Sequence, residues 1–423
     1  MILGRRLIKQ RCLAFRETWR GLSEYPNPEL KLPNLNLDME FYLNPENTAL
    51  IKQNIKSRNS TSDIDKVIDL SKLNPTAEVL MKELLNIPNM SSSKVRHLTE
   101  PRVVFQRDFI PPEFKIRNFE EISRILGGGR IQNLAYFSGE RTYYLTGVLA
   151  ELEQALIHWT VDTLSSKGFN LISVPDILHP DIIQRCGMTV DGERSQVYRL
   201  SKEFGEAALS GTAEMGIGGY LMSKQIQDLP LKLCAVSRCY RAEASQNQQD
   251  KGLYRVHQFN KVEMFVVTSG DENSSQDALE LVHSIERELF DQLGLSYRVL
   301  DMSPDELGNP AARKYDIEAW MPGRMFWGEI SSCSDCTDYQ SRRLNITDTD
   351  NRFCHTVNGT ACAVPRMIIA LCEQLQTLNG SISIPPVLRP YLRNREILQG
   401  KPKKLRPNLS FITSANFIEK TKI

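Results

Sequence analysis

The stretch that decides the fold reads CYRAE at residues 239–243 and RVHQFNKVEMF at residues 255–265. Residues 231–239 lead into it with the alternation of a strand, and residues 262–267 form a second apolar run. Between the two ends, residues 244–251 contain three Gln, one Asn and no large apolar side chain. Two β-prone runs joined by a polar segment predict an antiparallel hairpin. Its loop is longer than usual, and such loops are often functional.

The charged side chains of this stretch favour a nucleotide site. Arg241, Glu243 and Arg255 flank the turn, and Phe259 follows it. A guanidinium, a carboxylate and an aromatic face are the groups that hold a phosphate, an adenine edge and an adenine ring. An exposed ion-pair ladder on a hairpin would have the same residues, so this stretch alone leaves both interpretations open.

Together the two halves resemble motif 2 of class II aminoacyl-tRNA synthetases. The seryl-tRNA synthetase version of this motif is similar to residues 241–243, Arg-Ala-Glu, and to the run from Arg255 to Glu263. In sequence they most resemble the mitochondrial branch of that family. The resemblance extends from about residue 44 to residue 391. It implies an α+β fold, with a class II catalytic domain built on an antiparallel sheet flanked by helices and with a small helical N-terminal domain.

Residues 144–174 predict a long helix followed by a strand. Apolar residues recur at helical spacing from Tyr144 to Leu164, Gly168 ends the helix, and residues 169–174 predict a buried strand that Pro175 stops. This order resembles motif 1, the dimer-forming element of the class. A plain helix–strand unit of the core would have the same sequence pattern.

Residues 209–214, Leu-Ser-Gly-Thr-Ala-Glu, lie upstream of the hairpin. A hydroxyl and a carboxylate after a Gly turn suit a small ligand with an ammonium and a hydroxyl group. A helix cap is the ordinary interpretation of such a tripeptide. By its position the segment resembles the serine-binding loop of the family.

Further strands are predicted at residues 296–302 and 316–320, and the region from 326 to 345 carries Glu329 and Ser332. A carboxylate and a hydroxyl suit Mg²⁺ that is held mainly by substrate phosphates. Cys333 and Cys336 have the spacing of a zinc pair, but no second pair follows, and His355 is isolated. We therefore expect magnesium rather than zinc here.

Near the C-terminus, residues 358–360 predict a turn, and Pro365 begins a helix with Arg366 in its first turn. A helix N-terminus that carries an Arg attracts anions through both the macrodipole and the guanidinium. An Arg on a solvated helix face would have the same pattern. The segment resembles motif 3, with Pro365 where the general pattern has Gly.

The resemblance implies a serine–tRNA ligase that uses ATP and Mg²⁺ to form seryl-adenylate and transfers the seryl group to mitochondrial tRNA(Ser). The implied catalytic residues are Arg241 at the α-phosphate, Glu243 at the adenine edge and Arg366 at the γ-phosphate. The implied ATP-binding residues are Arg241, Ala242, Glu243, Val256, Phe259, Glu329, Ile330, Ser331, Ser332 and Arg366, with Glu329 and Ser332 also at the metal. The implied serine-binding residues are Thr212, Ala213, Glu214, Glu263, Asn358 and Thr360. Which of the two glutamates, Glu214 or Glu263, takes the ammonium stays open.

The composition of the chain limits the possible domain organisation and the possible class of protein. The chain has 423 residues, 41% hydrophobic and 24% charged, with a net charge of +1, so it is long enough for two domains of a soluble globular protein. The small net charge means that any contact with RNA is local. Nine cysteines scattered through apolar runs predict reduced thiols. No apolar run approaches the roughly 18–20 residues of a membrane span, so we expect no membrane insertion.

Residues 1–22 alternate basic and apolar residues, and Glu17 is their only acidic residue. This is typical of a mitochondrial transit peptide and predicts the mitochondrial matrix as the location, although a basic surface helix is an alternative. We expect a helical, tRNA-binding type of domain at 23–105, a catalytic domain at 106–395 and a basic tail at 396–423.

The expected N-terminal domain is smaller than the corresponding domain of the family that the chain resembles. Asn44 and Pro45 predict a helix start, and residues 64–73 and 77–87 predict two short helices. The family has a coiled-coil arm of 40–60 Å that reaches the tRNA, whereas these segments span about 15–18 Å each. A truncated arm implies that other surfaces, or a partner chain, read the tRNA. A dimer is expected, either a homodimer or a heterodimer with a synthetase-like paralogue.

Two alternatives stay open at this point. The truncated arm favours a catalytically silent paralogue that acts as a binding or regulatory subunit, against which the complete set of polar residues argues. The second is another adenylating ligase on the same fold, against which Thr212, Glu214 and Thr360 argue because they suit serine.

Overall fold

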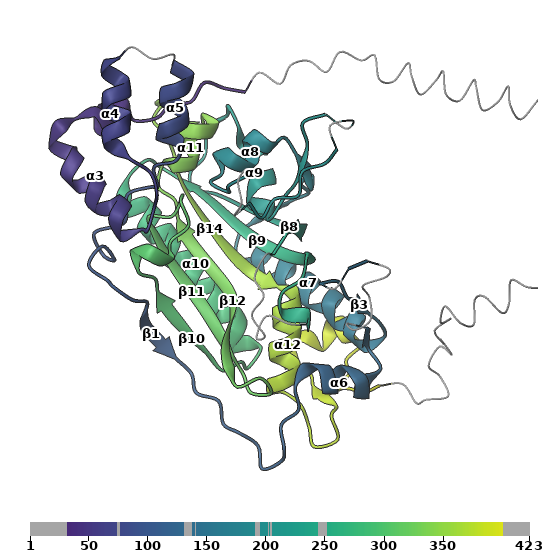
Figure 1. Ribbon diagram of the computed structural model, residues 1–423. Coiled ribbons are helices and arrows are strands. Elements are labelled where there is room, and N and C mark those ends of the chain that lie inside the picture. Colours follow the sequence, from purple (N-terminus) through teal and green to yellow (C-terminus); the bar gives the residue numbers. More distant parts are fainter. Residues whose placement is uncertain are drawn as a thin grey trace, which may run out of the picture. The chain divides into compact units, whose positions relative to one another are not determined.

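An eight-stranded sheet forms the centre of the structure, a computed structural model that describes residues 32–73, 77–130, 138–139, 141–190, 195–201, 203, 205–243 and 252–400 (Figure 1). The strand order is β1-β10-β11-β12-β14-β9-β8-β4. The strands are β1 (Arg102–Gln106), β4 (Asn170–Ile172), β8 (Leu231–Tyr240), β9 (Gln258–Thr268), β10 (Tyr297–Asp301), β11 (Arg313–Met321), β12 (Phe326–Asp335) and β14 (His355–Ala363). All neighbours are antiparallel except β4 and β8, which are parallel. The predicted antiparallel sheet is confirmed apart from this edge strand.

The predicted hairpin is the pair β8 and β9. Their register runs from Leu231 opposite Val267 to Tyr240 opposite Gln258. Alternating side chains bury opposite faces of the sheet, because successive residues of a strand point to opposite sides. Met264 packs into the core on one face, while Phe265 packs into a second cluster on the other. The predicted loop at 244–251 lies outside the described residues.

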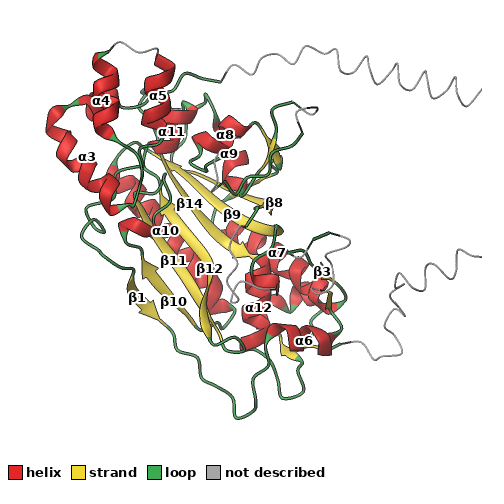
Figure 2. Cartoon of the chain, viewed as in Figure 1, coloured by secondary structure: helices red, strands yellow, loops and turns green. Residues whose placement is uncertain are grey.

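Helices cover both faces of the sheet (Figure 2). On one face α10 packs against β14 and β12, and α7 and α12 pack against each other and against β9. On the other face α9 packs against β8 and β9. The helices of this part are α6 (Phe119–Leu126), α7 (Val148–Ser166), α8 (Pro180–Arg185), α9 (Ala213–Leu221), α10 (Glu272–Gln292), α11 (Tyr339–Leu344) and α12 (Val364–Gln374). Because α9 covers only part of its face, the rest of that face is left for the cleft described below.

Short paired strands and 3-10 turns complete this part. The pairs are β2 (Gly129–Arg130) with β3 (Tyr144–Leu145), β5 (Ile177–Leu178) with β6 (Ala208–Leu209), β7 (Gln225–Ile226) with β13 (Thr347–Asp348), and β15 (Ile382–Ser383) with β16 (Ile397–Leu398). The 3-10 turns are Gly252–Tyr254, Pro304–Glu306, Pro386–Leu388 and Pro390–Leu392.

The N-terminal region contains α2 (Met39–Leu43), α3 (Pro45–Ser57), α4 (Ile64–Lys72) and α5 (Ala77–Leu85). Asn44 caps α3 by accepting a hydrogen bond from the backbone N–H of Glu46, and Pro45 is its first residue, as predicted. α4 and α5 have nine residues each, so each spans about 14 Å. They pack against each other. The hairpin has the short length that the sequence predicts.

Three local predictions are wrong. The long helix begins at Val148, not at Tyr144, because Tyr144 and Leu145 pair with β2 and Gly147 turns the chain with φ of 54°. The strand predicted as buried at 169–174 is the edge strand β4, whose Leu171 is 54% exposed. Residues 358–360 form no turn, because they lie within β14 and pair with β12 and β9.

The residues from Leu35 onward cluster into one compact unit. β1 belongs to the central sheet, so the expected boundary at residue 105 falls inside a strand. The expected transit peptide at 1–22 and residues 401–423 of the expected tail lie outside the described residues. Among the residues that are described, no helix has both the length and the apolar character that a membrane crossing needs.

Candidate functional site

A cleft opens on the face of the sheet that α9 leaves partly uncovered. It contains about 560 Å³ of space between its walls, part of it open to solvent. Arg241 at the end of β8 and Arg366 in the first turn of α12 both line it, although they lie far apart in the sequence. The other lining residues are Glu243, Tyr254, Arg255, Val256, Phe259, Lys261, Glu329, Ile330, Ser331, Ser332, Thr360, Ala363 and Pro365.

Arg366 is fixed by contacts on two sides. Its Nη1 donates to the backbone oxygen of Glu329 at 3.0 Å and lies 3.2 Å from that residue's carboxylate. Its Nε donates to the backbone oxygen of Tyr254 at 3.3 Å, and its Cζ lies 4.6 Å from the centre of the Tyr254 ring. The guanidinium is thereby held at the cleft wall in a defined orientation, as recognition of an anion requires.

Arg241 and Glu243 lie where β8 leaves the sheet. The Arg241 guanidinium lies 5.4 Å from the centre of the Phe259 ring, and its Nε donates to the backbone oxygen of Gly211 at 3.4 Å. Glu243 is buried, has φ of 41° and accepts a hydrogen bond from Arg255 Nη1 at 2.7 Å. A non-glycine residue in this backbone region is uncommon and costs free energy, so surrounding contacts hold it there.

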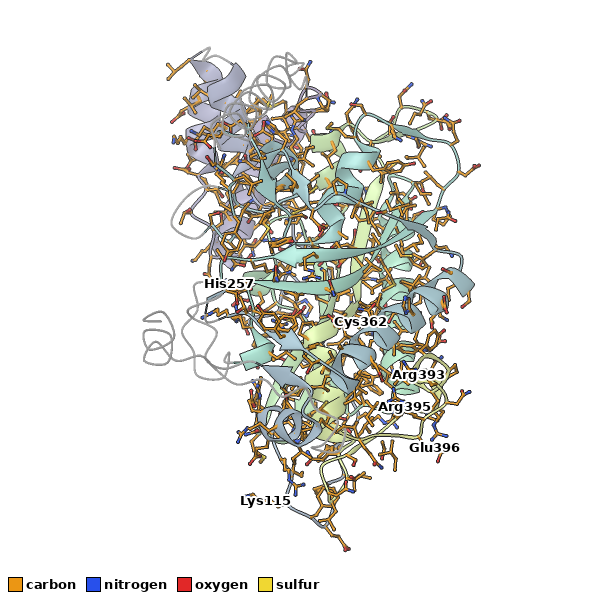
Figure 3. All side chains as sticks on the ribbon, turned by 90° about the vertical axis from the view of Figure 1, so that its right-hand side faces the viewer. Lys115, His257, Cys362, Arg393, Arg395 and Glu396 are labelled. Carbon is orange, nitrogen blue, oxygen red and sulfur yellow. The ribbon has the colours of Figure 1, made fainter. Side chains whose placement is uncertain are left out.

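His257 supports this end of the hairpin from β9's side (Figure 3). Its Nδ1 lies 2.8 Å from the Tyr198 hydroxyl and 3.0 Å from the backbone oxygen of Arg241. The backbone N–H of Arg241 also donates to the backbone oxygen of His257 at 2.8 Å. These contacts fix the backbone from which the Arg241 side chain enters the cleft.

Polar side chains continue from the cleft toward α9. Glu214 in the first turn of α9 accepts hydrogen bonds from Gln340 Nε2 at 2.5 Å and from Asn358 Nδ2 at 2.9 Å. Thr212 precedes the helix as its cap residue but makes no side-chain cap bond. Its buried hydroxyl lies beside the carboxyl group of Glu263. A hydroxyl that is not used by the helix is available to a ligand.

Lys261 is a residue of the cleft that the sequence analysis did not single out. It is 6% exposed, forms an ion pair with Glu263, and its Nζ donates to Thr360 Oγ1 at 3.4 Å. Its signal in the sequence was its position two residues before Glu263, since residues i and i+2 of a strand share a face. Lys261 thus joins the predicted serine residues Glu263 and Thr360 to the predicted nucleotide residues.

The two buried glutamates have raised pKa values. Burial, and then the charge of Glu263, raise the pKa of Glu214 to about 7. Burial also raises the pKa of Glu263, although Lys261 opposes this. Two buried carboxyl groups with raised pKa values form a site that gains from a bound cationic group, because a nearby positive charge stabilises their ionised forms.

The residues expected at a magnesium ion fit that ion. Glu329 and Ser332 both line the cleft. Burial tends to raise the pKa of Glu329, but Arg366, Lys314 and Arg241 outweigh it and keep the pKa below its ordinary value. Asp316 lies opposite Ser332 in the sheet, and its buried Oδ1 has no hydrogen-bond partner in the described part of the chain. An ionised carboxylate, a hydroxyl and an unused oxygen are the hard oxygen donors that Mg²⁺ prefers.

Not every predicted residue presents its side chain to the cleft. Ile330 packs into the hydrophobic core, and the Ser331 hydroxyl donates to the backbone oxygen of Thr360 at 2.6 Å. Ala213 is buried in the cluster beneath α9. The backbone N–H of Ala242 donates to the backbone oxygen of Gln196. These four residues shape the wall or its support, whereas the remaining predicted side chains line the cleft or the adjoining polar region.

Comparison with known proteins agrees with this arrangement. Residues 198–375 match the family model described as tRNA synthetase class II core domain (G, H, P, S and T). The mitochondrial serine–tRNA ligase of Bos taurus is 44% identical over 309 residues, 71% of this chain, and the chain spans 58% of that relative's length. The serine–tRNA ligase of Treponema denticola is 37% identical, and the match covers 84% of this chain and 98% of the relative.

A solved structure of a cytoplasmic serine–tRNA ligase from Naegleria fowleri in complex with AMP is also similar. It superposes with a TM-score of 0.75 at 26% identity, over 88% of this chain and 99% of the other. The cleft lies within the segment that matches the class II core. The chain therefore belongs to the serine–tRNA ligase family.

Proposed function

We propose that this chain is an ATP-dependent serine–tRNA ligase that forms AMP. The observation that carries the proposal is the meeting of Arg241 and Arg366 in one cleft, with the Glu329 carboxylate beside Arg366. Two cationic side chains that converge on one cavity suit a polyphosphate. The names of the relatives support the same activity.

In the first step a carboxylate oxygen of serine attacks the α-phosphorus of ATP. The new O–P bond forms as the bond from that phosphorus to the β-bridging oxygen breaks, which gives seryl-adenylate and pyrophosphate. Such a step depends on positioning and on neutralising charge. Arg241 holds the α-phosphate and Arg366 the γ-phosphate. Phe259 and Val256 face the adenine ring, and the Glu243 carboxylate accepts a hydrogen bond from the edge of the adenine.

Serine lies on the side of the cleft nearer α9. Its ammonium group is held by the buried carboxylates of Glu214 and Glu263, and its hydroxyl by Thr212 and Thr360. Lys261 reaches both Glu263 and Thr360, so it connects the two halves of the site. Alanine is rejected because it would leave buried polar groups unpaired, at a cost of about 1–3 kcal/mol each.

Glu329 and Ser332 would hold Mg²⁺ together with the phosphates of ATP. When it is bound, the ion neutralises charge on the phosphates. The ordered contacts of Arg366 to the backbone of Glu329 hold that carboxylate in place for the ion.

In the second step a hydroxyl of the terminal adenosine of tRNA attacks the carbonyl carbon of seryl-adenylate, and AMP leaves. We propose mitochondrial tRNA(Ser) as the substrate, the mitochondrial matrix as the location, and a dimer as the working form. The bovine relative's name supports the compartment. The short hairpin of α4 and α5 means that the tRNA is read mainly by other surfaces or by a partner chain.

Serine-dependent exchange of pyrophosphate into ATP tests the first step without tRNA. Arg241→Ala should reduce the exchange rate by at least about 100-fold, since removal of one positioned donor to a developing charge costs that much or more. Circular dichroism should show an unchanged fold. Arg352→Ala is the matched control, because Arg352 is 68% exposed, pairs with Asp348 and Asp350 and does not line the cleft. Exchange at the wild-type rate in Arg241→Ala would refute the assignment.

The wild-type chain separates the two alternatives. A catalytically silent paralogue would show no exchange with serine. A different adenylating ligase would show exchange with another carboxylic acid and not with serine. Charging of mitochondrial tRNA transcripts, by the chain alone and with any chain that co-purifies, then tests the second step.

A further inference from the structure

A buried group of metal-ligating side chains lies on the far face of the sheet from the cleft. His283 and Glu286 come from α10, and Cys333 comes from β12, against which α10 packs. They are 8%, 0% and 0% exposed. Their ligand atoms all lie within 4.8 Å of one another. The cleft residues are on the opposite face, because Ser332 and Cys333 are successive residues of one strand.

The polar atoms of this group are incompletely paired. The Nδ1 of His283 is buried without a hydrogen-bond partner among the described residues. The Glu286 carboxyl group lies beside the Cys333 thiol and the Ser331 hydroxyl, which only partly oppose the effect of burial on its pKa. Buried polar groups are nearly always paired, because an unpaired one costs free energy. An unpaired imidazole nitrogen beside a buried carboxyl group and a thiol therefore indicates a ligand.

We propose that His283, Glu286 and Cys333 bind one Zn²⁺ ion. An imidazole nitrogen, a carboxylate oxygen and a thiolate sulfur are the three donor types that zinc takes in proteins, and water would complete a tetrahedral set. Magnesium and calcium are excluded as occupants, since they require oxygen donors.

The charges of the group suit a buried zinc ion. Burial raises the pKa of Glu286 to about 8 and lowers the pKa of His283 to about 4. Burial also raises the pKa of the Cys333 thiol. Zinc binds an ionised carboxylate and a thiolate, so its binding would release the protons of the Glu286 carboxyl and the Cys333 thiol, and a site of one dication and two anions is neutral overall.

The surroundings orient the ligands. His283 and Glu286 are three residues apart, so they lie on one face of the helix. The His283 ring stacks on Tyr315 with centroids 4.5 Å apart and planes at 26°. On the other side of Glu286 is Gly359 of β14, where an added Cβ would come within 2.8 Å of the Glu286 carboxylate. The ion would thus join α10 to β12, the strand that also carries Ser332.

The pair Cys333 and Cys336, which has zinc spacing in the sequence, is not the site. The Cys336 thiol lies 3.6 Å from Asn358 Nδ2, beside the serine end of the cleft. Cys333 lies within β12, whereas Cys336 lies just after its end, so the two thiols do not bind one ion despite their spacing in the sequence. The zinc proposal rests on residues 50 apart in the chain, and it does not depend on the proposed function.

Metal analysis of the full-length chain tests the proposal. The protein is dialysed with a chelator, reloaded with Zn²⁺, freed of loose metal and measured by plasma mass spectrometry. We expect one Zn²⁺ per chain in the wild type and its loss in Glu286→Gln and in Cys333→Ala. Cys362→Ala is the matched control and should keep the ion, because Cys362 is a buried cysteine of β14 outside the group (Figure 3).

Cobalt gives a second readout that does not depend on activity. Co²⁺ in place of zinc should show a sulfur-to-metal charge-transfer band in the wild type that disappears in Cys333→Ala and persists in Cys362→Ala. Added Zn²⁺ should raise the Tm of the wild type and leave the Tm of Glu286→Gln unchanged. A wild type that takes up no zinc, or zinc that remains in both ligand variants, would overturn the proposal.

Discussion

Glu214 is the residue at which burial and charge conflict most clearly. Two side-chain amides, from Gln340 and Asn358, donate to the same carboxylate oxygen. Burial and the nearby Glu263 nevertheless raise its pKa to about 7 from an ordinary value of 4.5. The hydrogen bonds favour the charged form, and desolvation outweighs them. Such a conflict is common at binding sites, where a ligand supplies the missing charge.

Replacement of Glu214 by Gln should therefore stabilise the protein at high pH. Between pH 4.5 and pH 7 the folded wild type keeps a proton that the unfolded chain has lost, so its stability falls as the pH rises through this window. At pH 8.5 we expect Glu214→Gln to have a free energy of unfolding about 1–3 kcal/mol above that of the wild type. At pH 4 the two should be equal.

Chemical denaturation at the two pH values measures this difference. Glu206→Gln is the matched control, because Glu206 is 61% exposed and its substitution should change neither value appreciably. A difference between Glu214→Gln and wild type that is the same at both pH values would contradict the explanation by pKa. The same variant should also bind serine more weakly if Glu214 holds the ammonium.

At the residue scale the sequence identified charged groups better than it identified their contacts. Arg241, Glu329 and Arg366 were predicted from local motifs, and all three line one cleft. Lys261 was missed because its importance comes from Glu263 and Thr360, and Thr360 lies on another strand. The His283, Glu286 and Cys333 group was missed for the same reason. Contacts between distant segments are not encoded in local spacing.

At the scale of elements, one side chain joins the N-terminal helices to the sheet domain. Arg58 at the end of α3 is 7% exposed. Its Nη1 donates to the backbone oxygens of Asn89 at 3.1 Å and Ala311 at 2.7 Å, and its Nη2 donates to that of Gly308 at 2.5 Å. No carboxylate pairs with it in these contacts, and burial lowers its pKa to about 10. In the described part of the chain, these hydrogen bonds of the guanidinium all go to backbone carbonyl groups.

Arg58→Met should loosen this junction without harming the cleft. Hydrogen bonds to a charged donor contribute about 1.5–3 kcal/mol each and are not additive, so we expect a loss of about 2–4 kcal/mol in stability. Faster proteolysis near residue 89 should accompany it, while pyrophosphate exchange at low temperature stays near the wild-type rate. Lys56→Met, a change on the exposed face of α3, is the control. A stable, protease-resistant Arg58→Met would show that the junction depends on other contacts.

Element types were predicted well, and element ends were predicted poorly. The cap at Asn44, the hairpin of β8 and β9, and the helix at Pro365 follow from local chemistry, and all are present. Tyr144 continues the apolar spacing of α7 but pairs with Arg130 instead. Residues 358–360 contain the turn-forming pair Asn-Gly, yet the strands on both sides keep them in β14. In each case a tertiary contact overrides a local preference.

At the scale of the whole molecule, the edge of the sheet bears on the proposed dimer. β4 is the last strand in the sheet order, so one of its edges has no partner strand among the described residues. Leu171 on that strand is 54% exposed, and Ile177 a few residues later is 56% exposed. Proteins usually protect such edges with charges or cover them with another chain. β4 carries neither a Lys nor a Pro, so a second chain is the cover that fits our proposal.

Leu171→Glu should therefore shift the chain from dimer to monomer. A carboxylate at this position would be buried unpaired in the interface, which costs more free energy than the lost apolar contact. Analytical ultracentrifugation over a range of concentrations measures the shift as an increased Kd of at least about tenfold. Leu378→Glu is the matched control, because Leu378 is 70% exposed and lies after α12 in a segment that is not part of the central sheet. If Leu171→Glu and wild type sediment alike as dimers, the interface lies elsewhere. If the wild type is a monomer at every concentration, this chain does not form a homodimer, and a paralogous partner becomes the chain to seek.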